Sequence, residues 1–433
     1  MLAEIITTGE EVLSGQITDT NAVWLSQWLA EKGLRLTRRT TVGDRLEDLV
    51  KVLRERGREA DVLLVNGGLG PTVDDLSAKA AAEASGQTLV EFPQWVTALK
   101  EKFARLGRDM PPNNLKQAWL PASATLLDNP VGTACGFMLR IEKALAFFTP
   151  GPPYELKRMM NDQVGPYLDQ QLSLKPQNFL KKLNSFGLAE AKVDALMEDL
   201  VLPKGLQLGF RAHFPYIETK LIGWGESTAE DAAGYAAVAT EIRTRLGAFL
   251  CYEDEPSLPH WLQTVMQKRN FTLALAESCT GGMVAQQLVD IPNSSVYFDR
   301  GMVTYSNQAK VDMLDVPAAI LEQHGAVSME TAQAMARGAQ RRARVTHALS
   351  ITGVAGPGGG TEEKPVGTVG FALATPENIY TQLLQLPNWG RTRIRQLSAA
   401  LALDMLRRYL QGVPVFGDFD YAKQRITDTQ SNP

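Results

Sequence analysis

Short apolar runs alternate with amphipathic helical patterns over the first 170 residues. Strand patterns cover 2–9, 35–43 and 61–71, helical patterns cover 20–33 and 46–57, and a further strand with a proline-rich exit falls within 145–156. Strands that alternate with helices in this way build a mostly parallel sheet with helices on both faces. We therefore predict an α/β domain over residues 1–170.

The same rhythm returns over residues 258–413. Helices are expected at 260–269, from 279, and at 308–322, 328–343 and 391–410, and strands are expected at 271–276, 300–305, 345–352 and 366–373. This pattern predicts a second α/β domain. The tail beyond it, which contains RITDTQSNP, is expected to fray.

The stretch between the two domains has a different pattern. FLKKLNSFGLAEAKVDALMEDL is charged and is expected to be helical, whereas residues 206–225 alternate like a half-exposed antiparallel pair. We predict an α/β protein in which two three-layer α/β/α domains, 1–170 and 258–413, are joined by a small α+β, KH-like module over 176–252. The module lacks a GXXG loop flanked by lysines, so RNA binding is not expected.

Composition narrows the class of protein. The 433 residues carry a formal net charge of −4, which gives no general attraction to nucleic acid or to anionic membranes. Three widely spaced cysteines favour neither disulfides nor a zinc site, and no apolar run is long enough for a membrane span. With no signal peptide pattern at the start, we expect a cytoplasmic protein without nucleic acid or membrane partners.

A first glycine-rich turn follows the apolar run that ends near residue 66. Gly67, Gly68 and Gly70 expose backbone N–H groups at the start of a helical pattern, which suits a phosphate. Asp74 and Asp75 would repel phosphate unless a divalent cation lies between them, and such cations prefer hard oxygen ligands. The alternative is that an aspartate only caps the following helix.

A second turn, AESCTGG over residues 276–282, offers two nucleophiles, Ser278 and Cys279. A cysteine reacts only as the thiolate, which requires a base or a cation nearby. None of the four histidines falls in a loop near this turn, but Lys310 lies in the first turn of an expected helix, after a strand that ends at Tyr305. A lysine whose pKa is lowered by desolvation can replace histidine as the base.

A second glycine-rich loop lies within residues 350–371, and its flexible backbone suits a phosphate or an oxyanion. The alternative is a long disordered hairpin. The last expected helix begins with Arg391, Arg393 and Arg395, and arginine binds phosphate in a bidentate manner. For each arginine taken alone, a solvated helix face is the alternative.

Four motifs resemble the N-terminal domain of the CinA family, which is related to molybdopterin-binding proteins: TTGEEVLSGQITDTN (7–21), NGGLGPTVDD (66–75), NPVGTACGF (129–137) and TPGPPYEL (149–156). The resemblance implies a pyrophosphatase that acts on ADP-ribose with a divalent metal. It places the nucleotide and phosphate site on Gly67, Gly68, Gly70, Thr72 and Asn21, and the metal on Asp74, Asp75 and Glu11.

Four further motifs are similar to the family's C-terminal domain of the PncC type: AESCTGG, RGMVTYSNQAK, QHGAVS and TGVAGPGGGTEEKPVGTV. The resemblance implies hydrolysis of the carboxamide of nicotinamide mononucleotide to nicotinate mononucleotide and ammonia, without a cofactor, in pyridine nucleotide recycling. It implies Ser278 as the nucleophile, Lys310 as its base and Tyr305 as an assisting group, with Cys279 only filling space. The residues expected to contact the substrate are Glu277, Thr280, Gly281, Gly282, Thr352, Gly353, Gly356, Gly358, Arg391 and Arg395.

Several alternatives stay open at this point. Glu277 either orients the lysine or caps the turn. The C-terminal domain could be a non-catalytic nucleotide-binding module, and the family name points to an interaction protein associated with competence or DNA damage. We expect nicotinamide mononucleotide and ADP-ribose as ligands and a homodimer as the assembly.

Overall fold

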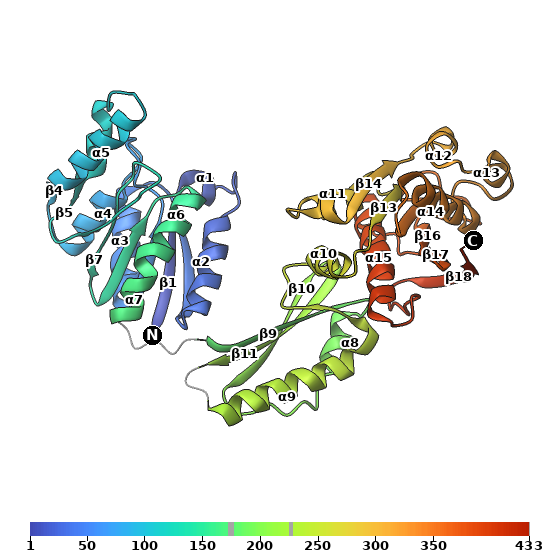
Figure 1. The fold of residues 1–433 in the computed structure, drawn as a ribbon. Coiled ribbons are helices and arrows are strands. Elements are labelled where there is room, and N and C mark those ends of the chain that lie inside the picture. The colour runs from blue at the N-terminus through green and yellow to red at the C-terminus, as the bar shows by residue number, and fades with distance from the viewer. Residues whose placement is uncertain (172–176, 225–227, 433) are drawn as a thin grey trace. The chain divides into compact units, whose positions relative to one another are not determined.

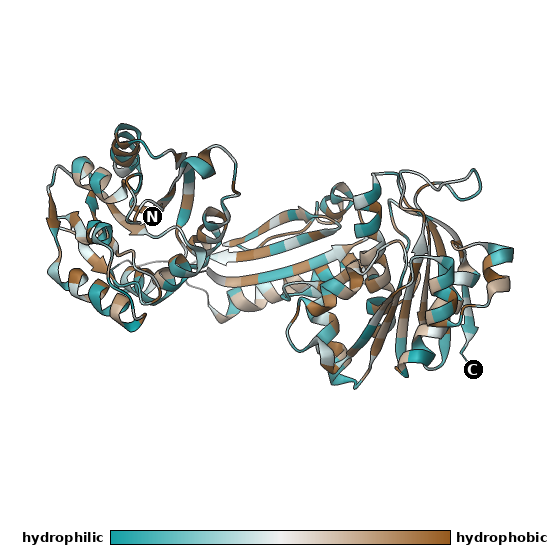
Figure 2. Ribbon diagram, turned by 90° about the horizontal axis from the view of Figure 1, so that it is seen from above, coloured by the Kyte–Doolittle hydropathy of each residue, from teal (hydrophilic) through white to brown (hydrophobic). Residues whose placement is uncertain are grey.

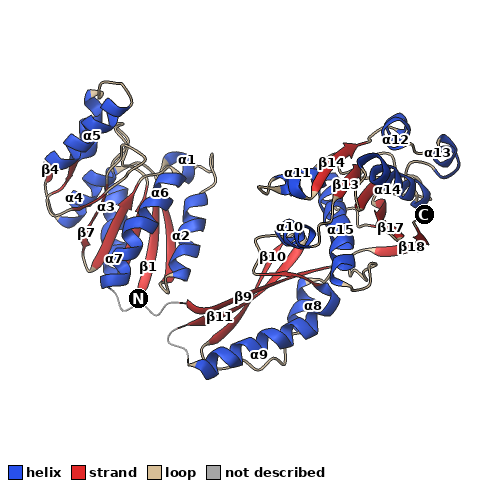
Figure 3. Ribbon diagram, viewed as in Figure 1, coloured by secondary structure: helices blue, strands red, loops and turns tan. Residues whose placement is uncertain are grey.

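The computed structural model describes residues 1–171, 177–224 and 228–432, and these form two compact units. The first unit comprises residues 1–178 and 224–227, and the second comprises residues 179–223 and 228–433. In each unit, strands are enclosed by helices (Figure 3). Within the described ranges, no helix combines the length and the apolar character needed to cross a membrane.

The first unit is built on a six-stranded sheet in the order β2-β1-β3-β8-β7-β6 (Figure 1). Strands β2, β1, β3 and β8 run parallel, and β7 and β6 continue the sheet antiparallel. Its elements are β1 (Leu2–Thr8), α1 (Glu10–Leu13), α2 (Thr20–Glu31), β2 (Arg35–Val42), α3 (Leu46–Glu59), β3 (Val62–Asn66), α4 (Ser77–Ser85), β4 (Leu89–Glu91), α5 (Pro93–Arg105), η1 (Pro112–Ala118), β5 (Trp119–Pro121), β6 (Thr125–Leu127), β7 (Gly136–Ile141), β8 (Ala144–Thr149), α6 (Pro153–Met159), η2 (Met160–Val164) and α7 (Gly165–Gln171).

Both faces of this sheet are buried. On β1, Ile5 packs in a cluster with Leu25 of α2, whereas Ile6 packs on the opposite face with Leu49 and Leu53 of α3. Strands β3 and β8 are therefore apolar along most of their length, as expected for parallel strands that are covered on both sides. Figure 2 colours each residue of the ribbon by its hydropathy. This is the three-layer α/β/α arrangement predicted from the sequence.

The second unit contains two sheets. A four-stranded sheet has the order β10-β11-β9-β12, and a six-stranded sheet has the order β14-β13-β15-β16-β17-β18. The elements are β9 (Gln177–Phe186), α8 (Glu190–Ala195), β10 (Leu206–His213), β11 (Tyr216–Trp224), α9 (Ala229–Leu246), η3 (Gly247–Phe249), β12 (Leu250–Glu253), α10 (Leu258–Lys268), β13 (Leu273–Glu277), α11 (Met283–Val289), η4 (Ser294–Val296), β14 (Phe298–Val303), α12 (Asn307–Leu314), α13 (Ala318–His324), α14 (Met329–Ala343), β15 (His347–Gly353), β16 (Thr368–Ala374), β17 (Asn378–Gln385), α15 (Arg391–Gln411) and β18 (Lys423–Ser431).

In the larger sheet, β14, β13 and β15 are parallel, and β16, β17 and β18 continue it antiparallel. Ala274 and Ala276 of β13 pack with residues of α14 on one face, and Leu273 and Leu275 pack with residues of α15 on the other. The antiparallel pair at 206–225 is confirmed as β10 and β11. The predicted start of the module, residue 176, lies outside the described residues.

Three expectations about this unit were wrong. The charged stretch after residue 177 begins as β9, a central strand in which Leu183 and Phe186 are buried, so tertiary packing outweighs its charged composition. The tail does not fray, because β18 pairs with β17 along its length. The single helix expected at 308–322 is two helices, because Asp315 adopts a left-handed conformation and Pro317 starts α13.

The four-stranded module is continuous with the larger domain. Phe186 and Cys251 of the module belong to the same apolar cluster as residues of α15. The buried guanidinium of Arg407, on α15, donates hydrogen bonds to the carbonyl oxygens of Ala248 (2.9 Å) and Leu250 (3.1 Å), and it is paired with buried Asp404 on the same helix. A polar network and an apolar core thus cross from the module into the domain.

Candidate active sites

The turn AESCTGG joins β13 to α11, as the sequence predicts. Ser278 follows the last residue of β13, and its N–H donates to the carbonyl oxygen of Ile351 on the neighbouring strand β15 (2.9 Å). Gly281 (φ 59°) and Gly282 (φ 91°) then adopt left-handed conformations, which other residues rarely tolerate. The turn therefore needs its glycines, and it fixes Ser278 at the carboxyl end of the parallel strands.

Glu277 caps helix α11. Its buried carboxylate accepts hydrogen bonds from the backbone N–H groups of Gly282 (3.0 Å), Val284 (3.2 Å) and Ala285 (2.8 Å). Both carboxylate oxygens are used in this way, so Glu277 holds the turn instead of orienting the lysine. The N–H of Gly281 is also used inside the turn, where it donates to the carbonyl oxygen of Ser278. Hence the N–H groups of both glycines, which were expected to face the substrate, have partners within the protein.

Ser278 and Lys310 lie in direct contact. Lys310 Nζ is 3.2 Å from Ser278 Oγ and donates to the carbonyl oxygen of Thr304 at 2.9 Å. Ser306 caps α12 through a hydrogen bond from the N–H of Ala309, and this cap places Lys310 in the first turns of the helix. The 3.2 Å distance allows a neutral Lys310 amine to accept the proton of the Ser278 hydroxyl.

Burial makes Lys310 a plausible base. Its side chain is only 1% exposed, and desolvation lowers the pKa of its ammonium group below the ordinary lysine value. Within residues 1–171, 177–224 and 228–432, no Asp or Glu forms an ion pair with Lys310 that would counteract this effect. A lysine in this environment spends more time as the neutral amine than a free lysine does.

Cys279, the other candidate nucleophile, is unsuited to that role. Its side chain is buried in the apolar cluster beneath α15, and desolvation raises the pKa of its thiol to about 12. Nucleophilic attack by cysteine needs the thiolate, which this site disfavours. Cys279 therefore packs as a small apolar residue, as the other buried thiols Cys135 and Cys251 do.

Two arginines at the start of α15 hold the surrounding loops. Arg395 donates to the carbonyl oxygens of Cys279 (Nε, 3.1 Å) and Thr280 (Nη2, 2.7 Å), both in the nucleophile turn. Arg391 donates to the carbonyl oxygen of Gly356 (2.7 Å) and to the hydroxyl of Tyr305 (3.1 Å). Tyr305 is 63% exposed and meets Arg391, so this structure does not bring its hydroxyl to the Ser278–Lys310 pair.

The second glycine loop is ordered by its own backbone hydrogen bonds. The N–H of Val354 donates to the carbonyl oxygen of Thr368, and the N–H of Gly367 donates to the carbonyl oxygen of Val354. Thr352 is buried, and its hydroxyl donates to the carbonyl oxygen of Ala326 (2.6 Å). Three glycines of this loop were also expected to contact the substrate. A Cβ at Gly353 would clash with Val369, and Gly356 has a positive φ, so both positions favour glycine. A Cβ at Gly358 would meet no neighbouring atom.

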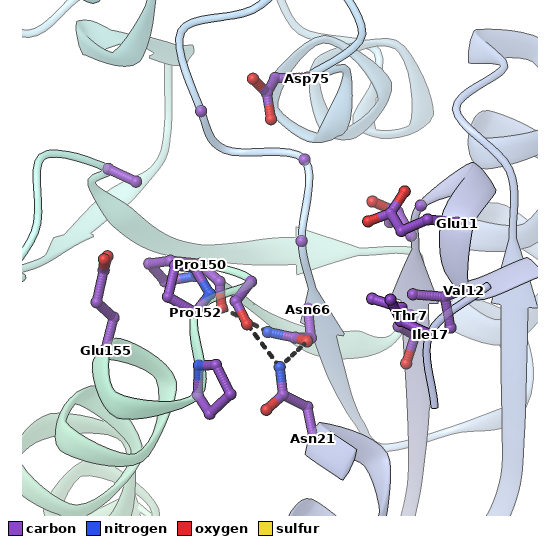
Figure 4. A pocket seen from close by; sticks show the side chains of 18 of the residues that line it. Thr7, Glu11, Val12, Ile17, Asn21, Asn66, Asp75, Pro150, Pro152 and Glu155 are labelled. Atoms are coloured by element: carbon purple, nitrogen blue, oxygen red, sulfur yellow. Dashed lines mark hydrogen bonds between the residues drawn. The ribbon is translucent and has the colours of Figure 1, made fainter. Parts of the chain in front are cut away.

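The first unit has a pocket of about 530 Å³ at the carboxyl ends of its parallel strands (Figure 4). Asn66, at the end of β3, forms the floor together with Asn21. The amide of Asn21 donates to Asn66 Oδ1 (2.9 Å) and to the carbonyl oxygen of Gly151 (2.7 Å), and Asn66 donates to the carbonyl oxygen of Pro150 (2.6 Å). Asn21, which the resemblance assigns to the nucleotide site, thus lines this pocket at the strand ends.

The first glycine turn lines the same pocket. Gly67 and Gly68 have positive φ angles, and a Cβ on either residue would approach Thr8 closely. Thr8 is buried, lines the pocket, and its hydroxyl has no hydrogen-bond partner among the described residues. Asp75 accepts from the N–H of Thr72 (2.8 Å), so one predicted metal ligand also stabilises this turn.

The lining of this pocket is strongly acidic. Its described residues include no lysine, arginine or histidine but contain six carboxylates, which are Glu11, Asp19, Asp44, Asp74, Asp75 and Glu155. Burial raises the pKa of Asp44, and the nearby charges of Glu11 and Asp74 raise it further. Within the described part of the chain, no three His, Cys, Asp or Glu side chains are gathered tightly enough to hold a metal ion.

Sequence reasoning missed two residues of these sites. Asp44 follows strand β2, and the rule that strand ends carry ligands could have found it. The carbonyl oxygen of Thr304, which accepts from Lys310, belongs to the backbone, and no residue type signals such a role.

Fold and sites define a class of protein: two α/β units, one with a carboxylate-lined pocket and one with a buried Ser–Lys pair. The family described as "Probable molybdopterin binding domain" matches residues 4–170, and the CinA C-terminal domain matches residues 256–410. The chain is 49% identical over 419 residues to a CinA-like protein of Shewanella sp. (strain ANA-3), covering 97% of this chain and 98% of that one. The chain therefore belongs to the CinA family.

Other relatives carry different names. A protein of Shewanella oneidensis named nicotinamide-nucleotide amidohydrolase PncC is 49% identical over 97% of this chain and 98% of its own length. A crystal structure of the competence/damage inducible protein CihA from Agrobacterium tumefaciens is 43% identical and covers 35% of this chain and 93% of that one, with a TM-score of 0.35.

Proposed function

We propose that the second unit hydrolyses the carboxamide of nicotinamide mononucleotide to nicotinate mononucleotide and ammonia. The observation that carries this proposal is the buried contact between Ser278 Oγ and Lys310 Nζ at 3.2 Å. It is supported by the name of the Shewanella oneidensis relative, which aligns over nearly the whole chain. A buried lysine that contacts a serine and has a lowered pKa is typical of a catalytic site.

The reaction needs only groups that the pair supplies. Ser278 Oγ attacks the carboxamide carbon while neutral Lys310 takes the hydroxyl proton. The C–N bond then breaks, and Lys310 returns the proton to the departing nitrogen, which leaves as ammonia. Water attacks the resulting ester and gives one proton to Lys310, which passes it to Ser278 Oγ as the ester C–O bond breaks. The second proton of the water leaves to solvent, and nicotinate mononucleotide is released as the carboxylate.

The oxyanion of the tetrahedral intermediate requires fixed donors. Because the N–H groups of Gly281 and Gly282 already have acceptors, we assign this role to the N–H groups of Cys279 and Thr280. They follow the nucleophile directly, as an oxyanion donor does in comparable strand-to-helix turns. Arg395 fixes both residues by their carbonyl oxygens.

The direct test incubates the full chain with nicotinamide mononucleotide. Ammonia and nicotinate mononucleotide should form in equal amounts, and nicotinamide riboside, which lacks the phosphate, should be a poor substrate. A folded protein that releases no ammonia would rule out this function.

The rate of ammonia release should rise with pH along a limb set by Lys310. Protonated Lys310 cannot accept the serine proton, so activity is low at acidic pH and increases as the lysine is deprotonated. Because burial lowers the pKa of Lys310, the limb should lie clearly below the value of about 10.4 for a free lysine. Values of kcat/KM, obtained from initial rates between about pH 6 and about pH 10, give the position of this limb. A flat profile would contradict this role of Lys310.

Arg395→Ala should lower kcat about ten- to a hundredfold with a smaller change in KM, because the turn that carries Ser278 loses two hydrogen bonds and drifts. This expectation replaces the phosphate-binding role suggested by the sequence, because Nε and Nη2 of Arg395 both donate to the nucleophile turn. Steady-state kinetics of Arg395→Ala, with exposed Arg341→Ala as control, would decide. A raised KM with normal kcat would restore the phosphate role.

We further propose that the first unit cleaves the pyrophosphate of ADP-ribose. The strand-end pocket, its glycine turn and the amide floor support this second function. A bound divalent cation would supply charge neutralisation for the two phosphates. Because the described carboxylates are not gathered into a three-ligand site, one or two of them would hold the cation together with the phosphates of the substrate. Asp44 lines the pocket beside Glu11, Asp74 and Asp75, the carboxylates that the resemblance assigns to the metal.

A further inference from the structure

The hairpin that joins β10 to β11 brings an aromatic ring to the deamidase site. Phe214, at its tip, stacks beneath the guanidinium of Arg393, with 4.2 Å between the guanidinium carbon and the ring centre. Its ring also meets the ring of Trp389 edge to face at 6.2 Å. Both partners lie at the start of α15, so the four-stranded module touches the catalytic domain at this point.

The start of α15 holds three segments of the site together. Arg391 joins the second glycine loop, at Gly356, to Tyr305, which follows β14. One helical turn later, Arg395 holds the nucleophile turn. A shift confined to the first helical turn would therefore displace the second glycine loop and Tyr305, which Arg391 contacts, whereas Arg395 holds the nucleophile turn from the next turn of the helix.

The sequence of α15 does little to stabilise its own first turn. The N-cap residue is Gly390, with a φ of 87°, and no side chain caps the helix. Three arginines in the opening turns also lie at the positive end of the helix dipole, which is unfavourable. The ring of Phe214 partly offsets this, because an aromatic face attracts a guanidinium. The support for this helix end comes from outside the helix.

We propose that Phe214 is a positioning residue for substrate binding, which makes the module a part of the deamidase site. It acts through Arg393 and Trp389 on the first turn of α15, and so on Arg391 and the glycine loop. This inference rests on the proposed deamidase function. If the binding-competent arrangement of α15 is populated less often, the apparent affinity falls by the same factor. Ser278 lies in the turn after β13, which Arg395 holds from the second turn of α15, and Lys310 lies on α12, so a shift of the first turn of α15 does not act directly on their contact.

The test compares three variants of the full chain. Phe214→Ala should raise KM for nicotinamide mononucleotide about three- to tenfold and change kcat less than about twofold. Phe214→Tyr keeps the ring and should restore the wild-type KM. Leu180→Ala is the matched control, since Leu180 lies on β9 of the same module and is 39% exposed, as Phe214 is. Its KM and kcat should equal those of wild type.

A second readout is independent of catalysis. Hydrogen exchange of peptides that cover residues 389–397 should be faster in Phe214→Ala than in wild type and Phe214→Tyr, without substrate and with an unchanged unfolding temperature. If wild type releases no ammonia, the proposed function fails while the exchange data still test the positioning role. The proposal is overturned if Phe214→Ala keeps the wild-type KM and exchange, or if Phe214→Tyr behaves like Phe214→Ala.

Discussion

Alanine at Ser278 is expected to lower ammonia release from nicotinamide mononucleotide at least about a thousandfold, and alanine at Lys310 should do nearly the same. The two atoms are 3.2 Å apart, and each needs the other: without the amine the hydroxyl keeps its proton, and without the hydroxyl the amine has nothing to activate. The double variant should be little slower than either single one, because residues that act as a unit are strongly non-additive. Single-turnover rates of the three variants measure this.

Cys279→Ala is the matched control for this experiment. The thiol neighbours Ser278 in sequence but is buried with its pKa raised to about 12, so its loss should leave kcat largely intact while lowering stability. An active Ser278→Ala beside an inactive, folded Cys279→Ala would make the protein a cysteine amidase. ADP-ribose cleavage should survive all of these changes, since its pocket lies in the other unit.

Chelation should separate the two activities. We expect EDTA to abolish AMP release from ADP-ribose and to leave ammonia release unchanged. The described residues of the pocket include six carboxylates and no basic side chain, so a cation is needed to offset their repulsion of two phosphates. The Ser–Lys reaction needs no such cation. Parallel assays of AMP and ammonia, with and without EDTA and with Mg²⁺ added back, measure this. AMP release that persists in EDTA would refute metal dependence.

Asp44→Asn tests the same pocket by mutation. It should reduce AMP release about a hundredfold and raise the Mn²⁺ concentration needed for half-maximal release. Glu101→Gln is the control, because Glu101 is an exposed carboxylate of the same unit in a loose pair with Arg105 at 3.9 Å. An equal Mn²⁺ requirement in Asp44→Asn and wild type would exclude Asp44 as a ligand.

The fold was predictable where local pattern and packing agree. The βα alternation predicted the parallel strands of both six-stranded sheets, because strands buried on two faces are mostly apolar. It failed where packing overrides composition: Lys181 and Lys182 made β9 look helical, yet the strand lies at the centre of its sheet, with Lys181 paired to Glu253 and Asp254. It failed again at β18, whose polar residues carry no sign of the neighbouring strand that they pair with.

The site was predictable at the level of residue type. Ser278 and Lys310 were identified from motifs and lie in contact. Glu277 and Arg395 instead bind backbone groups of the turn, and these bonds depend on which backbone groups the turn leaves unpaired. The spacing of residues in the sequence does not reveal those unpaired groups. The proposal of a homodimer in the cytoplasm also stays a prediction, since it concerns partners and surroundings beyond one chain.

The apolar core shared by the four-stranded module and α15 determines where this chain can be cut into stable fragments. A gene segment that begins at residue 256, where the family match starts, would encode the Ser–Lys pair but leave behind the strands that bury Phe186 and Cys251. Arg407 would lose both of its carbonyl acceptors in that fragment, and a wide apolar surface would be exposed to solvent. We therefore expect a fragment of this chain that begins at residue 256 to be less stable than one that begins at residue 179 and keeps the module.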